Sequence, residues 1–235
     1  MNRQNTVALI TGASRGLGLA IARAYAARGI QLILTARGAH DLQLAATGLP
    51  DALAVPGDVA DRAHVERLVS AGLERFGHID VLINNASELG PSPMQPLAEL
   101  SPGQFEDILR VNVVAPLQLI QAVLPHMRAQ RSGLIVNVTS DAAVQAYPTW
   151  GGYGASKAAL EQLSRVLAEE LEGTGLRVYV VDPGDMDTAM HRAAEPGVDL
   201  SHLPGPEVVA PVFVQLLDET APTGRFEAQR MLISV

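Results

Sequence analysis

Short apolar runs alternate along this chain with longer segments in which apolar residues recur with helical periodicity. The apolar runs predict strands at Thr6–Thr11, Gln31–Thr35, Ala52–Val55, Val81–Asn84, Gly133–Val138 and Leu176–Val181. The periodic segments predict helices near Gly16–Arg28, Ala60–Phe76, Gln104–Arg128 and Gly152–Leu171. Because unbroken apolar runs separated by helices are typical of strands buried on both faces, the pattern predicts an α/β fold with a parallel sheet covered by helices on both sides.

Helix starts and loops can also be placed from the pattern. Asp61, or the residue before it, suits the N-cap of the second helix, and Ser101 with Pro102 after it is an N-cap followed by a first-turn proline. The segments Leu89–Pro96 and Glu195–Pro206 are rich in proline and glycine, which predicts surface loops. Ligands of such sheets bind beyond the carboxyl ends of the strands, so side chains there are the first candidates for a site.

The composition fits one domain over residues 1–235, in which 48% of the residues are hydrophobic and 18% are charged. A net charge of −8 argues against a surface that binds nucleic acid or an anionic membrane. The absence of cysteine excludes disulfides, thiolate metal sites and cysteine nucleophiles. The N-terminus has no signal-peptide pattern and no apolar run reaches the roughly 20 residues of a membrane span, so we expect a cytoplasmic protein.

Three glycines connect the first predicted strand to the helix that follows it. Glycine permits a tight turn and lets backbone N–H groups approach a pyrophosphate at the helix N-terminus. The spacing is Gly-x-x-x-Gly-x-Gly, and such a turn can be purely structural, but its place after the first strand of an alternating chain predicts a dinucleotide site. The candidate contacts in this turn are Gly12, Ser14, Arg15, Gly16, Leu17 and Gly18.

The only lysine, Lys157, follows Tyr153 by four residues, although Lys and Arg together number 17. Residues at this spacing share one face of a helix. An ammonium near the phenol favours the phenolate and lowers the tyrosine pKa from about 10, which makes tyrosine a general acid/base. The alternative is that compositional bias left a single lysine on a solvated helix, and the pair alone is weak evidence.

The ordered set of motifs resembles the short-chain dehydrogenase/reductase family over most of the chain. The set comprises Thr11-Gly12-x-x-x-Gly16-x-Gly18, Asp58-Val59, Asn84-Asn85-Ala86, Asn112, Ser140, Tyr153-x-x-x-Lys157, Pro183-Gly184 and Thr188. The resemblance implies a single-domain, Rossmann-like, doubly wound parallel sheet that binds a dinucleotide and carries a substrate loop at about residues 185–206.

The resemblance also implies catalytic roles for four residues. Tyr153 would exchange a proton with the substrate oxygen, while Lys157 lowers the pKa of Tyr153 and hydrogen-bonds the nicotinamide ribose. Ser140 would polarise the carbonyl, and its alternative is a turn former at a strand end. Asn112 would support a water that relays protons past Lys157. Its alternative is a structural asparagine that holds a helix bend, and the two roles are compatible.

The cofactor would lie against residues that follow several of the predicted strands. Asp58 resembles the residue that hydrogen-bonds adenine, with a carboxylate in a surface turn as the alternative. Thr188 suits the nicotinamide carboxamide, and Asn85 is as much architectural as ligand-binding. The predicted contacts outside the glycine turn are Arg37, Asp58, Val59, Asn85, Ala86, Tyr153, Lys157, Pro183, Gly184 and Thr188.

The choice between NADPH and NADH can be argued from charge. An acid at the end of the second strand would accept from a ribose 2′-OH, but none is present there and Arg37 follows the strand. Arg37 and Arg15 suit a 2′-phosphate through charge-assisted hydrogen bonds, so we expect NADP(H) over NAD(H). The alternative is two ordinary surface arginines.

The substrate region departs more from the family. Ser87 replaces the usual glycine, and Glu88 either presents a charge at the substrate entrance or is a solvated loop residue. Met186, Met190 and His191 are candidates to line an apolar substrate pocket, and core packing is the alternative for the two methionines. We expect Trp150 to pack internally or to contact another subunit, with a wall of the substrate pocket as the alternative.

The C-terminus and the histidines bear on assembly and metals. Family members commonly end in a Gly-rich strand that helps to build a tetramer, whereas the candidate final strand here, Met231–Val235, is short and follows Arg230. We therefore expect a homodimer, formed by the helices near Asn112 and Tyr153, and the tetramer is in doubt. None of the six histidines has metal-ligand spacing, so no metal site is predicted.

The resemblance, together with the charge argument for NADPH, implies an NADPH-dependent oxidoreductase that reduces a small carbonyl compound to an alcohol, or catalyses the reverse. A sensor or regulatory protein that binds NADP on the same fold without turnover is the alternative from another class. A third reading is isomerisation or dehydration with a retained nicotinamide. The loops that form the substrate pocket leave the identity of the substrate open.

Overall fold

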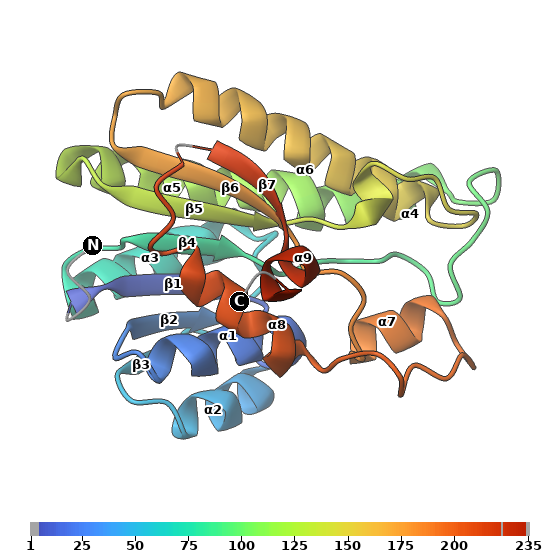
Figure 1. Ribbon diagram of the computed structural model, residues 1–235, viewed down its shortest axis with the longest axis horizontal. Coiled ribbons are helices and arrows are strands. Elements are labelled where there is room, and N and C mark those ends of the chain that lie inside the picture. The colour runs from blue at the N-terminus through green and yellow to red at the C-terminus, as the bar shows by residue number, and fades with distance from the viewer. Residues whose placement is uncertain (1–4, 222, 234–235) are drawn as a thin grey trace.

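The computed structural model of the chain describes residues 5–221 and 223–233. Within them, seven parallel strands form one sheet in the order β3-β2-β1-β4-β5-β6-β7 (Figure 1). The strands are β1 (Val7–Thr11), β2 (Gln31–Thr35), β3 (Ala52–Ala54), β4 (Val81–Asn84), β5 (Gly133–Val138), β6 (Leu176–Asp182) and β7 (Thr223–Glu227). The doubly wound α/β fold is confirmed, since the order reverses direction between β1 and β4.

Alternate residues of the central strands supply two separate hydrophobic cores. Ala8 and Ile10 of β1 belong to one core, and Val7 and Leu9 belong to the core on the other face. The first core is covered by α1 (Gly16–Ala26), α2 (Ala39–Thr47), α8 (Pro206–Gln215) and α9 (Ala228–Ile233). The second is covered by α3 (Arg62–Phe76), α5 (Ala115–Gln130) and the end of α6 (Gly151–Glu170).

The predicted strands agree with β1 to β6 to within one residue at each end, but the C-terminal prediction is wrong. Within the described residues, the last strand is β7, which pairs in parallel with β6, and residues 228–233 form α9. Met231 and Leu232 pack against the first core from this helix, so their apolar character reflects a helix face. The rest of the predicted strand, residues 234–235, lies outside the described residues.

The predicted capping at Ser101 is confirmed and opens a long helical stretch. Ser101 and Gln104 form a capping box around Pro102 at the start of α4 (Pro102–Leu109). A π-helical turn (Arg110–Val114) then separates α4 from α5. By length and composition alone, the whole stretch could cross a membrane, but its residues Leu119, Val123 and Met127 are buried against the sheet, as in a core helix.

The segment after β6 forms a separate lobe beside the carboxyl ends of the strands. It includes α7 (Ala189–Ala194), which the sequence pattern did not predict, and Figure 1 shows this helix set apart from the sheet. Residues 195–205 are irregular apart from turns, as predicted for a loop. The lobe therefore forms one wall of any site at this edge of the sheet.

Candidate functional site

A cleft of about 910 Å³ lies at the carboxyl ends of the strands. The turns after β1 to β6, the start of α6 and the α7 lobe line it. The predicted site residues that line this cleft are Gly12, Ser14, Arg15, Gly16, Leu17, Arg37, Asp58, Val59, Asn85, Ala86, Ser140, Tyr153, Lys157, Pro183, Gly184 and Thr188. Residues more than 170 positions apart in the chain are thus brought to one place; Gly18 and Asn112 are the two predicted site residues outside the lining.

The glycine turn is shaped by close backbone packing against the end of β4. Gly12 has a φ of +65°, and an added Cβ there would lie 2.8 Å from Nδ2 of Asn85. That amide donates to the Thr11 carbonyl at 2.8 Å. Gly18 lies behind the turn, where an added Cβ would clash with the Gly12 carbonyl. The role of Gly18 is therefore close packing of α1, and Asn85 is architectural as well as exposed to the cleft.

The N-terminus of α1 fits a pyrophosphate. Arg15, at the N-cap, makes no side-chain cap, and the first turn contains no acidic residue. Gly16 has a φ of +56° and open space where a Cβ would be. Backbone N–H groups and the positive end of the helix dipole are therefore available to an anion in the cleft.

The end of β2 presents Arg37 to the cleft, with its side chain 67% exposed. Its partner is the Glu88 carboxylate at 3.7 Å, from the loop after β4. Glu88, whose side chain is 30% exposed, therefore faces the arginine that is expected to bind a 2′-phosphate. Asp58 accepts from the N–H of Ala60 at 2.9 Å, so this carboxylate also closes the turn that leads into α3.

Tyr153 and Lys157 lie on one face of α6 and both are nearly fully buried. Nζ of Lys157 donates to the Val138 carbonyl at 2.9 Å and lies 5.5 Å from the centroid of the Tyr153 ring. Burial lowers the pKa of Lys157 to about 8. The ammonium is thus held over the ring and against the end of β5.

The predicted lowering of the Tyr153 pKa is not found in the cleft as it stands. Burial raises the pKa of Tyr153 above its ordinary value, hydrogen bonds with Ser87 and Ser140 act in the opposite direction, and the charges of Asp182 and Asp141 raise it further. Burial is the largest of these influences. Tyr153 is therefore a protonated phenol at neutral pH.

Asn112 is fully buried in the π-helical turn between α4 and α5. Nδ2 donates to the Glu88 carbonyl at 2.8 Å and to Oγ of Ser156 at 2.9 Å. Oδ1 accepts from the Glu88 N–H at 2.7 Å and from Oγ of Ser87 at 3.1 Å. Both donors and both acceptor positions of the amide are used, so the side chain joins the π-helical turn to the loop after β4 and to α6. A proton relay can use Asn112 only through its backbone carbonyl.

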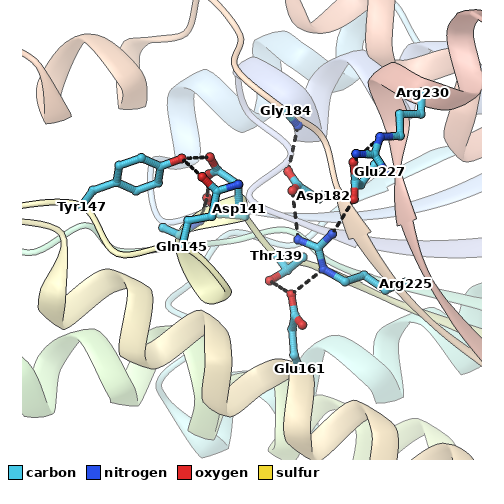
Figure 2. Close-up of polar contacts among 12 residues, drawn as sticks. Thr139, Asp141, Gln145, Tyr147, Glu161, Asp182, Gly184, Arg225, Glu227 and Arg230 are labelled. Atoms are coloured by element: carbon cyan, nitrogen blue, oxygen red, sulfur yellow. Dashed lines mark hydrogen bonds and ion pairs between the residues drawn. The ribbon is translucent and has the colours of Figure 1, made fainter.

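A residue that sequence reasoning missed, Asp141, lies beside the candidate catalytic serine. Oγ of Ser140 donates to Oδ1 of Asp141 at 2.9 Å (and accepts from a backbone N–H of the following turn). The Tyr147 hydroxyl lies 2.6 Å from Oδ2 of Asp141 (Figure 2), and this hydrogen bond raises the pKa of Tyr147 to about 12. No spacing motif marks Asp141; its position next to Ser140 was the only available signal.

The four candidate substrate-pocket residues all line the cleft, namely Trp150, Met186, Met190 and His191. The Trp150 ring meets Tyr147 and Tyr153 edge-on, with centroids 6.4 and 5.7 Å apart. Met186 is also part of the first core, and Met190 packs against the cluster that contains Tyr153. Both interpretations therefore hold for the methionines, and Trp150 is a wall of the cleft.

The chain resembles known proteins over most of its length. A family model described as short chain dehydrogenase matches residues 6–199. The chain is 39% identical over 189 residues to a 2-(R)-hydroxypropyl-CoM dehydrogenase of Xanthobacter autotrophicus, which covers 78% of this chain and 76% of that protein.

Solved structures with the same fold include one complex with NADP and one with NADH. A short chain dehydrogenase from Shigella flexneri complexed with NADP has a TM-score of 0.87 at 29% identity, covering 97% of this chain and 100% of that chain. A 3-ketoacyl-(acyl-carrier-protein) reductase from Brucella melitensis complexed with NADH has a TM-score of 0.87 at 26% identity, covering 95% and 96%.

Proposed function

The chain belongs to the short-chain dehydrogenase family of oxidoreductases, and on that premise we propose that it is an NADPH-dependent enzyme that reduces a carbonyl to an alcohol, or catalyses the reverse. The observation that carries the proposal is the placement of Ser140, Tyr153 and Lys157 in one cleft with the glycine turn. When bound, NADPH supplies the hydride that adds to the carbonyl carbon.

In the proposed mechanism, Tyr153 donates its hydroxyl proton to the substrate oxygen. A raised pKa suits this step, because the phenol stays protonated at neutral pH and is ready to act as an acid. Ser140 donates a hydrogen bond to the same oxygen, and to do so its hydroxyl leaves Asp141. Lys157 favours the phenolate that forms and orients the tyrosine from the next turn of α6.

The preference for NADPH rests on Arg37 and Arg15 at the adenosine end of the cleft. A 2′-phosphate would replace Glu88 as the partner of Arg37, exchanging a carboxylate at 3.7 Å for a doubly charged group with more acceptors. Relatives of known structure bind NADP or NADH, so the choice is a property of these side chains rather than of the fold.

We also propose a homodimer formed through α5 and α6. Apolar side chains are exposed on both helices, with Leu117 38% exposed on α5 and Val166 45% exposed on α6. A second copy of the same two helices would cover them. Light scattering on the intact protein tests this proposal, and a monomer at micromolar concentration would contradict it.

Turnover with a panel of carbonyl compounds tests the proposed function. NADPH oxidation would be followed with ketones, diketones, aldehydes, quinones, keto-esters, ring ketones and keto-acyl thioesters, with NADH in parallel. We expect turnover with one class and a preference for NADPH. No turnover with any class, in a sample shown to bind NADPH, would contradict the enzyme and favour a sensor.

A further inference from the structure

Arg225 of β7 lies between two buried carboxylates behind the cleft (Figure 2). Its Nε donates to Oε1 of Glu161 on α6 at 3.0 Å, and one terminal nitrogen donates to Oδ2 of Asp182 at the end of β6 at 3.0 Å. The other terminal nitrogen reaches the half-exposed Glu227 at 3.3 Å. The Glu161 and Asp182 side chains are only 3% and 9% exposed, so each needs a cation close by.

Each of these carboxylates also holds a segment that enters the cleft. Oε1 of Glu161 accepts from Oγ1 of Thr139 at 2.9 Å, and Thr139 immediately precedes Ser140. Oδ1 of Asp182 accepts from the N–H of Gly184 at 3.0 Å. The guanidinium therefore connects, through one carboxylate on each side, the two backbone segments that follow β5 and β6.

Glu161 continues the face of α6 that carries the catalytic pair. Tyr153, Lys157 and Glu161 follow one another at intervals of four residues and are all buried. A displacement of Glu161 would therefore also displace Lys157 and Tyr153 on the same helix face. The fork of an arginine is suited to this place because it donates to two carboxylates in fixed directions, which an ammonium cannot do.

We propose that Arg225 is a positioning residue, which holds Ser140 and the Pro183–Gly184 turn in the arrangement that the substrate oxygen and the nicotinamide half of the cofactor require. The proposal rests on the proposed function, in which Ser140 holds the substrate oxygen and the Pro183–Gly184 turn contacts the nicotinamide half. The strand that carries Arg225 is the last of the sheet, so a C-terminal element with no recognisable motif sets the geometry of the site.

Charge gives the same arginine a second effect on the cleft. Burial raises the pKa of Asp182, whereas the Gly184 N–H and Arg225 act in the opposite direction. Because the charge of Asp182 in turn raises the pKa of Tyr153, the guanidinium beside it offsets part of the negative field at the general acid.

The test compares Arg225→Gln and Arg225→Lys with the matched control Arg165→Gln. Arg165 pairs with the same Glu161, at 3.3 Å, but from a side chain that is 63% exposed. Two ligands would be titrated by calorimetry into each variant: NADPH, and 2′-phospho-ADP-ribose, which has the adenosine half but no nicotinamide. Thermal unfolding would report the folded fraction of each.

We expect Arg225→Gln to weaken NADPH binding by about tenfold while 2′-phospho-ADP-ribose binds within about twofold of the wild type. The NADPH affinity of Arg225→Lys should lie between those of Arg225→Gln and the wild type, because lysine keeps the charge but lacks the forked donors. Arg165→Gln should change the affinity for neither ligand by more than about twofold. A structural role alone would lower the melting temperature and leave the ratio of the two affinities unchanged.

An unchanged ratio in both Arg225 variants would overturn the positioning role, whether or not they lose stability. If the wild type itself binds 2′-phospho-ADP-ribose no better than ADP-ribose, the NADPH preference fails instead. If the wild type binds NADPH no more tightly than 2′-phospho-ADP-ribose, the assignment of the Pro183–Gly184 turn is wrong. The failure of the proposed function is therefore seen in the wild type, and the failure of the inference in the variants.

Discussion

Oγ of Ser140 lies 2.9 Å from Oδ1 of Asp141, so the hydroxyl that is proposed to hold the substrate oxygen is engaged by its own neighbour. Replacing Asp141 by Asn removes a negative charge that raises the pKa of Tyr153. We expect the apparent pKa of alcohol oxidation to move down by up to about one unit in Asp141→Asn. The pH profile of kcat/KM measures this; an upward shift would mean that Asp141 does not act through its charge.

The direction of the reaction should depend on pH through Tyr153. A raised pKa keeps the phenol protonated to higher pH than in free tyrosine, so carbonyl reduction is supported across the neutral range and lost as pH rises through that pKa. Alcohol oxidation needs the phenolate and should rise over the same alkaline interval. Initial rates in both directions between about pH 6 and 10 would check this, with reduction expected to persist over that range and oxidation to rise toward its alkaline end. Oxidation that is fastest at acidic pH is incompatible with Tyr153 as the base.

Arg37 and Glu88 should have opposite effects on cofactor choice. Arg37→Asp is expected to lower the NADPH/NADH affinity ratio by at least about tenfold, because it replaces attraction to the 2′-phosphate with repulsion. Glu88→Gln should raise the affinity for NADPH by about two- to fivefold, since the competing ion pair is partly exposed and weak. Binding titrations with both cofactors give the ratios. A ratio that does not fall in Arg37→Asp would show that the 2′-phosphate is held elsewhere.

Replacing Asn112 should affect the stability of the fold more directly than the catalytic step. Asn112→Ala removes the four hydrogen bonds of the amide and leaves partly buried backbone groups of Glu88 unpaired, for an expected loss of about 2–4 kcal/mol in the free energy of unfolding. Ser156→Ala removes a single partner of the same amide and should lose about 1–2 kcal/mol. Urea denaturation measures both. An Asn112→Ala protein as stable as the wild type would contradict the structural role.

Local patterns predicted the parts of this fold that are set within a few residues. The strands β1 to β6, the Ser101 cap and the Tyr153–Lys157 face of α6 follow from runs, caps and i, i+4 spacing. The strand β7 escaped prediction because its Gly, Arg and Glu side chains do not resemble those of a buried strand. The short helices α2 and α7 lack the length at which helical periodicity is recognisable.

Pairings between distant residues could not be predicted. Arg225 meets Glu161 across 64 positions, and Arg37 meets Glu88 across the cleft. No local pattern selects one carboxylate among 25 acidic residues as the partner of a given arginine. The pKa of Tyr153 was mispredicted for the same reason, since its burial and the charges of Asp141 and Asp182 come from several separate segments.

The measurement that tests the central claim most directly is NADPH turnover by Tyr153→Phe, with Tyr147→Phe as the matched control. Trp150, the only tryptophan and a wall of the cleft, reports cofactor binding by its fluorescence in both variants. Tyr153→Phe should bind NADPH as the wild type does and lose turnover by about 10²–10⁴-fold. Tyr147→Phe should keep turnover within about tenfold, because its hydroxyl contacts Asp141 and Gln145. Turnover that survives in Tyr153→Phe would contradict the assignment of the general acid and with it the proposed mechanism.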